Sequence, residues 1–346
     1  MSVVDRPVEP AEADVRGSGS RVAILVVLIV LIGVVAVASV AIGSRFLGPG
    51  EVWTALFDRA HAPDYAVGIV RDLRVPRTVL GIVAGLAIGA AGALAQGFTR
   101  NPLADPGILG VNAGAACAVV CGVYLLHITA PIQYMVFGLL GAVIAAAAVF
   151  WVSSLSGSSP LTLVLAGTGL TAFLLAITSA IVLIDTASLD AWRFWNVGSI
   201  AGRGFDVITA ATPFVAVGLV LSVICGFFLN VLGLGDDVSR SLGVRVVEIR
   251  SLGVLAITLL AGAATAACGP IVFLGLLAPH VARRLCGHDY RWIVPYSALL
   301  GASIIIFCDI VGRVVARPGE VQSGVMLSVL GAPFLIALVR RRQVAV

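Results

Sequence analysis

Residues 22–43 read VAILVVLIVLIGVVAVASVAIG, a run of apolar and small residues without a single charged side chain. An α-helix rises about 1.5 Å per residue, so this run is long enough to cross the roughly 30 Å hydrocarbon core of a bilayer. Four acidic residues precede it, whereas a cleaved signal peptide has a basic leader and a shorter apolar core. We therefore expect an uncleaved first membrane helix, preceded by a polar cytoplasmic tail over residues 1–21.

Similar runs recur along the whole chain. Of its 346 residues, 60% are apolar and only 12% are charged, whereas soluble domains carry about 25% charged residues. The runs are unbroken and do not alternate as barrel strands do, which predicts an all-α, polytopic membrane protein with a transmembrane domain over 22–342. We predict ten membrane-spanning segments, at 22–43, 75–97, 107–127, 131–153, 161–184, 206–233, 249–268, 271–287, 292–315 and 321–339.

Two sequence features predict how these segments pack. The shortest one, 271–287, adjoins Gly269 and Pro270 and contains Pro279. Proline frees backbone carbonyls that neighbouring helices must satisfy, so we expect this segment inside the bundle. In the second segment, small residues recur every four positions and share one helical face, which predicts close helix packing within the subunit in preference to a dimer face: Gly81, Gly85, Gly89, Ala93 and Gly97.

The distribution of arginines predicts the orientation. An even number of spans puts both termini on one side, and the positive-inside rule places them in the cytoplasm, with 13 arginines inside and 9 outside. Nine outward arginines oppose that rule and call for a functional explanation. Arg74 and Arg77 flank Pro76, which suits a first helical turn, so both guanidinium groups are expected to project from a helix entrance toward an acidic surface. Interfacial snorkelling is the alternative.

The ninth segment carries an intramembrane charge pair. Asp309 and Arg313 are four residues apart and meet on one helical face. Charges inside a membrane are costly and usually functional, although this pair could also neutralise itself and merely hold the bundle together.

On the predicted inner side, two connections stand out. Asn101 and Pro102 belong to a stiff turn between the second and third spans. Residues 234–250 form the longest charged connection, in which Asp236 or Asp237 caps a short helix, Gly243 ends it and a second short turn follows. This connection is either a docking surface for a soluble partner or a solvated loop.

Several function classes are excluded or disfavoured by the sequence. The chain has no lysine and hence no Walker-type phosphate loop, so it does not hydrolyse ATP by itself and is not expected to be an enzyme. Its six cysteines and His280 suit structural roles, and we expect no metal site and no cofactor bound by this chain. No basic block suggests binding to nucleic acid.

Taken in order, these segments resemble the FecCD-type permeases of type II ABC importers for iron–siderophore complexes, haem and vitamin B12. The matching pieces are Arg74–Arg77, Arg100–Pro106 with Leu109–Gly110, Trp195–Ser199, Leu242–Val244, Gly269–Pro270 with Gly275 and Pro279–His280, Asp309 with Arg313, and Gly331–Phe334. One departure is Gln322, which stands where the family commonly has a proline in a Glu-x-Pro-x-Gly motif.

The resemblance implies two permease subunits, identical or paralogous, around a translocation path for a small-molecule metal chelate. Two cytosolic ATPases would carry the ATP and magnesium, and an extracytoplasmic binding protein would deliver the ligand. By motif, Arg74, Arg77 and Arg313 look like docking residues for the binding protein. The coupling contacts with the ATPase look like Asp237, Arg240, Leu242, Gly243 and Val244.

The predicted function is thus ATP-driven import, most readily of iron(III)–siderophores, by alternating access across the plasma membrane. Import of haem or vitamin B12 uses the same architecture. An ion-coupled secondary transporter would need embedded carboxylates, of which Asp309 is the only clear example. A first-row metal importer and a scaffold without transport activity are the remaining alternatives.

Overall fold

The computed structural model describes residues 18–155 and 160–343, and every regular element in these ranges is helical. Most of the expected polar tail, 1–21, lies outside the described residues. The elements are α1 (Ser18–Ala41), α2 (Pro49–Phe57), α3 (Asp64–Val67), the π-helix η1 (Gly68–Arg74), α4 (Val75–Thr99), the 3₁₀-helix η2 (Pro106–Leu109), α5 (Val111–Leu126), α6 (Pro131–Leu155), α7 (Pro160–Ile184), α8 (Thr186–Asn196), α9 (Phe205–Leu232), α10 (Asp236–Ser241), α11 (Val246–Cys268), α12 (Leu274–Cys286), α13 (Tyr290–Val315) and α14 (Ser323–Gln343).

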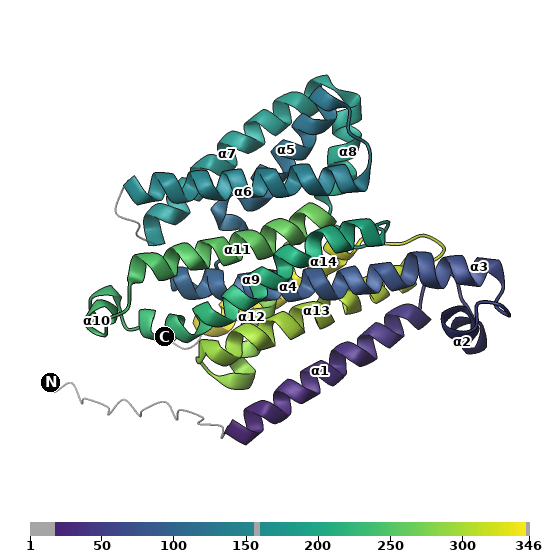
Figure 1. Ribbon diagram of the computed structural model, residues 1–346, viewed down its shortest axis with the longest axis horizontal. Coiled ribbons are helices and arrows are strands. Elements are labelled where there is room, and N and C mark those ends of the chain that lie inside the picture. The colour runs from purple at the N-terminus through teal and green to yellow at the C-terminus, as the bar shows by residue number, and fades with distance from the viewer. Residues whose placement is uncertain (1–17, 156–159, 344–346) are drawn as a thin grey trace.

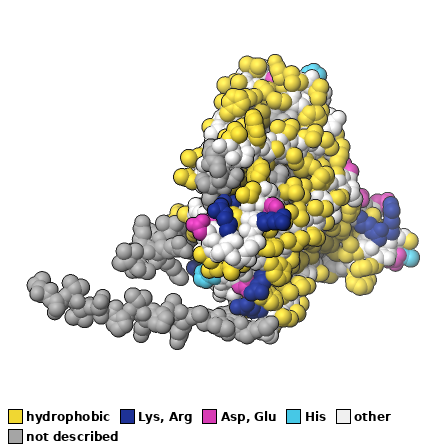
Figure 2. Space-filling model, turned by 60° about the vertical axis from the view of Figure 1, so that its left-hand side comes forward, with side chains coloured by type: hydrophobic (Ala, Val, Ile, Leu, Met, Phe, Trp, Pro, Cys, Tyr) yellow, Lys and Arg dark blue, Asp and Glu magenta, His cyan; other side chains and the backbone are white. Residues whose placement is uncertain are grey.

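Helix α4 is the centre of the bundle. It packs against α9, α11, α12 and α13, while α5 to α8 form a layer on one side and α1 lies along the other (Figure 1). The space-filling view shows hydrophobic side chains over much of the flanks of the molecule (Figure 2). Such a surface suits contact with lipid tails, whereas its exposure to water would be unfavourable.

The predicted all-helical membrane fold is confirmed. Each of the ten expected segments overlaps one of the helices α1, α4, α5, α6, α7, α9, α11, α12, α13 and α14. Among the described residues, seven helices are long and apolar enough to cross a membrane. Helix α12 has 13 residues and is therefore about 20 Å long, too short to cross the hydrocarbon core by itself. It packs against α4 and α13, as its interrupting prolines predicted.

The row of small residues on α4 is an internal packing face. A methyl group on Gly89 would lie 2.0 Å from the carbonyl oxygen of Ser297 in α13, and one on Gly85 would lie 2.4 Å from the backbone of Ala302. The two helix backbones therefore touch at these positions, and only glycine fits. This confirms packing within the subunit.

The two ends of the bundle differ in their connections. The start of α1, the short helix α10 and the end of α14 lie at one end, called the α10 end below (Figure 1). The opposite end, called the α2 end, carries α2 and α3. At the α10 end, Arg21 of α1 pairs with Asp289 before α13 at 3.5 Å, and the Tyr296 hydroxyl donates to the Arg21 carbonyl at 2.5 Å.

Candidate functional site

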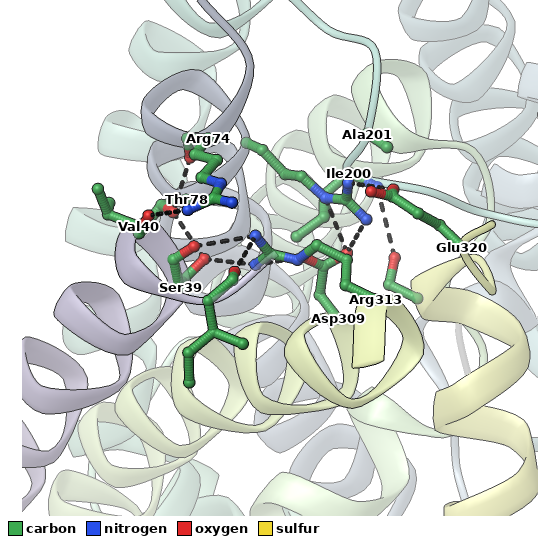
Figure 3. Close-up of polar contacts among 12 residues, drawn as sticks. Ser39, Val40, Arg74, Thr78, Ile200, Ala201, Asp309, Arg313 and Glu320 are labelled. Atoms are coloured by element: carbon green, nitrogen blue, oxygen red, sulfur yellow. Dashed lines mark hydrogen bonds and ion pairs between the residues drawn. The ribbon is translucent and has the colours of Figure 1, made fainter. Parts of the chain in front are cut away.

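The α2 end contains a cluster of five charged residues, all buried except Glu320, called the arginine cluster: Arg74, Arg77, Asp309, Arg313 and Glu320. The side chain of Asp309 is 0% exposed and lies between two guanidinium groups (Figure 3). Arg77 Nη2 is 2.7 Å from Asp309 Oδ1, and Arg313 Nη2 is 2.9 Å from Asp309 Oδ2. A single carboxylate therefore joins α4 to α13.

Two of these arginines, Arg74 and Arg313, donate hydrogen bonds to carbonyl oxygens at the C-terminal end of α1. The last carbonyl oxygens of a helix have no partner within it. Arg74 Nη1 donates to the carbonyls of Val40 and Ala41 at 2.9 and 2.8 Å, and Arg313 Nη1 donates to those of Ser39 and Ile42 at 2.9 and 3.0 Å. Cations at a helix C-terminus are also favoured by the helix dipole. The cluster thus ties α1 to α4 and α13.

Glu320 completes the cluster from the loop before α14. Its carboxylate accepts from Arg77 Nη1 at 2.5 Å and from the Ser44 hydroxyl at 2.9 Å. Burial raises the pKa of the Glu320 carboxyl, but the hydrogen bond and the positive charge of Arg77 outweigh burial and hold that pKa below its ordinary value. Glu320 therefore stays ionised and balances part of the charge of three arginines.

The expectation that Arg74 and Arg77 project from a helix entrance is wrong. Arg74, Arg77 and Arg313 are only 4%, 8% and 1% exposed, because their guanidinium groups bond to Asp309, Glu320 and the end of α1. The entrance itself is also absent, since η1 and α3 continue α4 backward from Val75. Pro76 cannot donate a hydrogen bond to the Asp72 carbonyl and its ring would clash with it, which accounts for a wider turn there.

A polar pocket of about 450 Å³ opens beside the cluster. Arg74, Arg77 and Arg313 contribute to its wall, and the exposed Arg45 lies on it as well. The role of the three cluster arginines in docking a binding protein therefore stays a prediction. Their charge can act through this pocket, although the side chains do not reach out of it.

At the α10 end, the predicted short helix is present. Gly243 has a φ of +81°, its N–H donates to the Arg240 carbonyl, and the Val244 N–H donates to the Ser239 carbonyl at 3.0 Å. This pattern is the Schellman motif that ends helices at glycine. The expected second short turn is wrong, because α11 begins directly at Val246. The expected cap is also wrong: Gly235 precedes α10 and no side chain caps it.

Asp236 does not cap α10 but forms ion pairs with two arginines. It accepts from Arg100 Nη2 at 3.0 Å and pairs with Arg250 Nη2 at 2.9 Å, so it joins the end of α4 and the start of α11 to α10. The pair Asp237 and Arg240 is exposed and 3.5 Å apart. Leu242 is 61% exposed, which leaves an apolar side chain on a firmly tethered surface.

The remaining motif residues shape the backbone. The Asn101 Oδ1 accepts the Leu103 N–H at 2.9 Å, which turns the chain at Pro102. Gly269 has a φ of +76°, and a methyl group there would lie 2.0 Å from the Trp195 carbonyl, so the Gly269–Pro270 segment packs directly on the end of α8. Pro279 is buried within α12.

Two contributors to the site were missed from the sequence. Ser39 and Thr78 share a hydrogen bond of 2.7 Å, and the Ser39 hydroxyl accepts from Arg313. Ser39 is a lone hydroxyl residue within an apolar run, and Thr78 directly follows Arg77, at the start of one. Among the described residues, no group of three or more His, Cys, Asp or Glu side chains is placed to hold a metal ion.

Comparison with known proteins agrees with this architecture. Ferric enterobactin transport system permease protein FepD of Escherichia coli (strain K12) is 42% identical over 306 residues, which cover 88% of this chain and 91% of that protein. Probable siderophore transport system permease protein YfiZ of Bacillus subtilis (strain 168) is 39% identical over 275 residues, 79% of this chain and 83% of that protein.

A solved structure has the same fold. A protein described as a metal-chelate type ABC transporter, in an inward-facing conformation, superimposes with a TM-score of 0.82 at 26% identity, covering 92% of this chain and 99% of that one. The model of the FecCD transport family matches residues 27–341. The match includes both the arginine cluster and the α10 region, and the chain belongs to the FecCD transport family.

Proposed function

We propose that this chain is the membrane-spanning permease subunit of an ATP-driven importer for ferric siderophores. The observation that carries the proposal is the family match over residues 27–341, together with relatives named for ferric enterobactin and siderophore transport. The multi-helical bundle supports it, because a path for a bulky cargo needs helices that can move against one another.

The two ends of the bundle suit different partners. We assign the α10 end to the cytoplasm, where a pair of ABC ATPases would receive α10 and the exposed Leu242 in a groove. Three ion pairs or hydrogen bonds at Asp236 hold α10 to α4 and α11. Movement of an ATPase would therefore pass into the bundle and open the path alternately to either side.

The α2 end suits the binding protein. The arginine cluster has three cations and two anions, so the pocket beside it carries net positive charge, to which the exposed Arg45 adds. Acidic side chains on the binding protein would be attracted to such a surface. The second permease subunit, identical or paralogous, would complete the path on the other side.

One observation opposes the alternative of an ion-coupled transporter. That mechanism requires an embedded carboxylate that can bind and release an ion or proton. Asp309 lies between Arg77 and Arg313 at 2.7 and 2.9 Å, and two fixed cations leave it no role as a carrier. Dissipating the proton gradient with ATP intact should therefore leave uptake unchanged.

Cellular uptake tests the proposed cargo. Cells lacking this gene would be supplied in turn with radioactive iron as ferric enterobactin, a ferric hydroxamate and ferric citrate. We expect uptake of at least one chelate to fall to background and to return when the gene is restored. Unchanged uptake of all three, together with loss of haem or vitamin B12 uptake, would contradict the siderophore assignment.

A further inference from the structure

A second cavity, separate from the polar pocket, lies between the ends of α1 and α4 beside α2. Its volume is about 720 Å³, within the roughly 300–1,000 Å³ of typical small-molecule sites. Its wall is formed by residues from all three helices, among them Val37, Val40, Val52, Leu56, Val79 and Ile82. We call this cavity the α1–α4 groove.

The groove has the chemistry of a hydrocarbon site. Its lining consists of aliphatic and aromatic side chains and Thr78. The Thr78 hydroxyl is already engaged, since it lies 2.7 Å from the Ser39 hydroxyl and donates to the Arg74 carbonyl at 2.8 Å. Water in a cavity needs two to four polar partners, and this lining does not supply them. An apolar occupant is therefore favoured.

The rim of the groove carries aromatic side chains of the kind found at a membrane interface. Phe46, Trp53 and Phe57 line the groove and are 80%, 65% and 68% exposed. The rings of Trp53 and Phe57 lie 4.6 Å apart on α2. Aromatic side chains are enriched where lipid tails meet headgroups. Since α1 ends at Ala41 and α2 begins at Pro49, the groove lies at one end of a candidate membrane span, where an interface is expected.

Two exposed arginines lie within two residues, along the sequence, of aromatic residues of the rim. Arg45 precedes Phe46, is exposed, and lies 4.9 Å over the ring of Tyr65. Arg59 follows Phe57 by two residues and is exposed, while the intervening Asp58 is paired with His61 at 2.9 Å. Basic and acidic side chains gather at this end, on the right of Figure 2. Arginine is well suited to bind phosphate.

We propose that the α1–α4 groove binds a membrane phospholipid, with one acyl chain in the groove and the phosphate beside Arg45 or Arg59. An acyl chain there would fill the space between α1 and α4 next to the arginine cluster, and so support the position of α1. The chemistry requires a long hydrocarbon tail joined to an anionic headgroup, and the membrane supplies this at high local concentration.

Native mass spectrometry of the purified full chain, stripped of lipid and then supplied with palmitoyl-oleoyl phosphatidylglycerol, tests this proposal. The variant Val79→Trp fills the groove, whereas Val34→Trp places the same ring on the exposed face of α1, outside the lining. We expect Val79→Trp to lose one bound lipid, with at least about a tenfold weaker apparent affinity, and Val34→Trp to bind as the original protein does. Ala36→Met fills the same groove with a smaller side chain, and it should also weaken lipid binding. It therefore tests the proposal even if the tryptophan variant misfolds.

A second experiment tests the position of the phosphate with the double variant Arg45→Gln and Arg59→Gln. If the phosphate lies beside these residues, the double variant binds phosphatidylglycerol several-fold more weakly and its binding depends less on salt. Equal lipid binding by the original protein and both groove-filling variants would overturn the proposal. So would a groove-filling variant that changes only self-association, because the occupant would then be a second copy of the chain.

Discussion

Asp309 illustrates how one residue can organise the end of a bundle. Its carboxylate has no exposed surface and faces Arg77 and Arg313, which in turn bond to Glu320 and to the end of α1 (Figure 3). Buried ion pairs often add little net stability, but breaking one leaves an uncompensated charge and is costly. The cluster is therefore sensitive to loss of any single member.

Replacing Asp309 with Asn should strongly destabilise the protein. The substitution leaves Arg77 and Arg313 facing each other without their shared anion, and breaking a buried pair costs about 3–5 kcal/mol. Thermal unfolding in detergent, followed by circular dichroism, should show a clear fall in Tm. Asp72→Asn is the matched control, because Asp72 is exposed at the same end. Equal Tm values for the two variants would contradict the role of Asp309.

Glu320 gives the cluster a defined dependence on pH. Because its pKa is lowered in the folded protein, its contribution to stability is present above the ordinary glutamate pKa of about 4.3 and is lost as the pH falls through the lower folded value. Glu320→Gln should therefore lower Tm at neutral pH, and the difference from the original protein should vanish in strong acid. A difference that persists at every pH would show that charge is not the cause.

At the scale of elements, the sequence predicted the long apolar helices and their approximate bounds, because a membrane span needs a long uncharged run. It also predicted α10, since Gly243 supplies the left-handed residue that a Schellman ending requires. Helices α8 and α2 were missed because they have only 11 and 9 residues, too few for a membrane span, and α8 also carries Asp190 and Arg193. The burial of Arg74, Arg77 and Arg313 could not be predicted from the sequence either, because it depends on long-range contacts between α1, α4 and α13.

The close contact between α4 and α13 depends on glycine residues in α4, which have no side chain. Gly89→Ala would place a methyl group 2.0 Å from the Ser297 carbonyl oxygen, and such overpacking costs about 1–3 kcal/mol. We expect a lower Tm for this variant. Gly33→Ala in α1 is the control, because nothing lies within 4 Å of its added methyl group. A Gly89→Ala protein as stable as the Gly33→Ala protein would refute the close contact.

Helix α10 carries the proposed coupling surface. Leu242→Asp should reduce transport by the assembled importer several-fold, because a charge would replace an exposed apolar contact with the ATPase. The firmly bonded Asp236 should preserve the fold, so Tm should not change. Leu242→Met should restore most of the activity. Full transport by Leu242→Asp would remove this residue from the coupling surface.

At the scale of the whole molecule, the bundle has unequal faces. Helix α4 is buried on nearly all sides, whereas α1 and α7 expose most of their apolar residues, including Val37 and Phe173. Such exposed faces contact lipid or another permease subunit. The sequence contains no phosphate loop. Under the proposed function, partner ATPases would supply the free energy for uphill transport.

Transport by reconstituted vesicles tests whether partner proteins drive uptake through this chain. Vesicles containing this chain alone would be compared with vesicles that also contain its partner permease, ATPase and binding protein, each supplied with a ferric siderophore and with or without ATP. We expect uphill accumulation only in the complete system with ATP. Uphill accumulation by the chain alone, driven by an ion gradient, would contradict it.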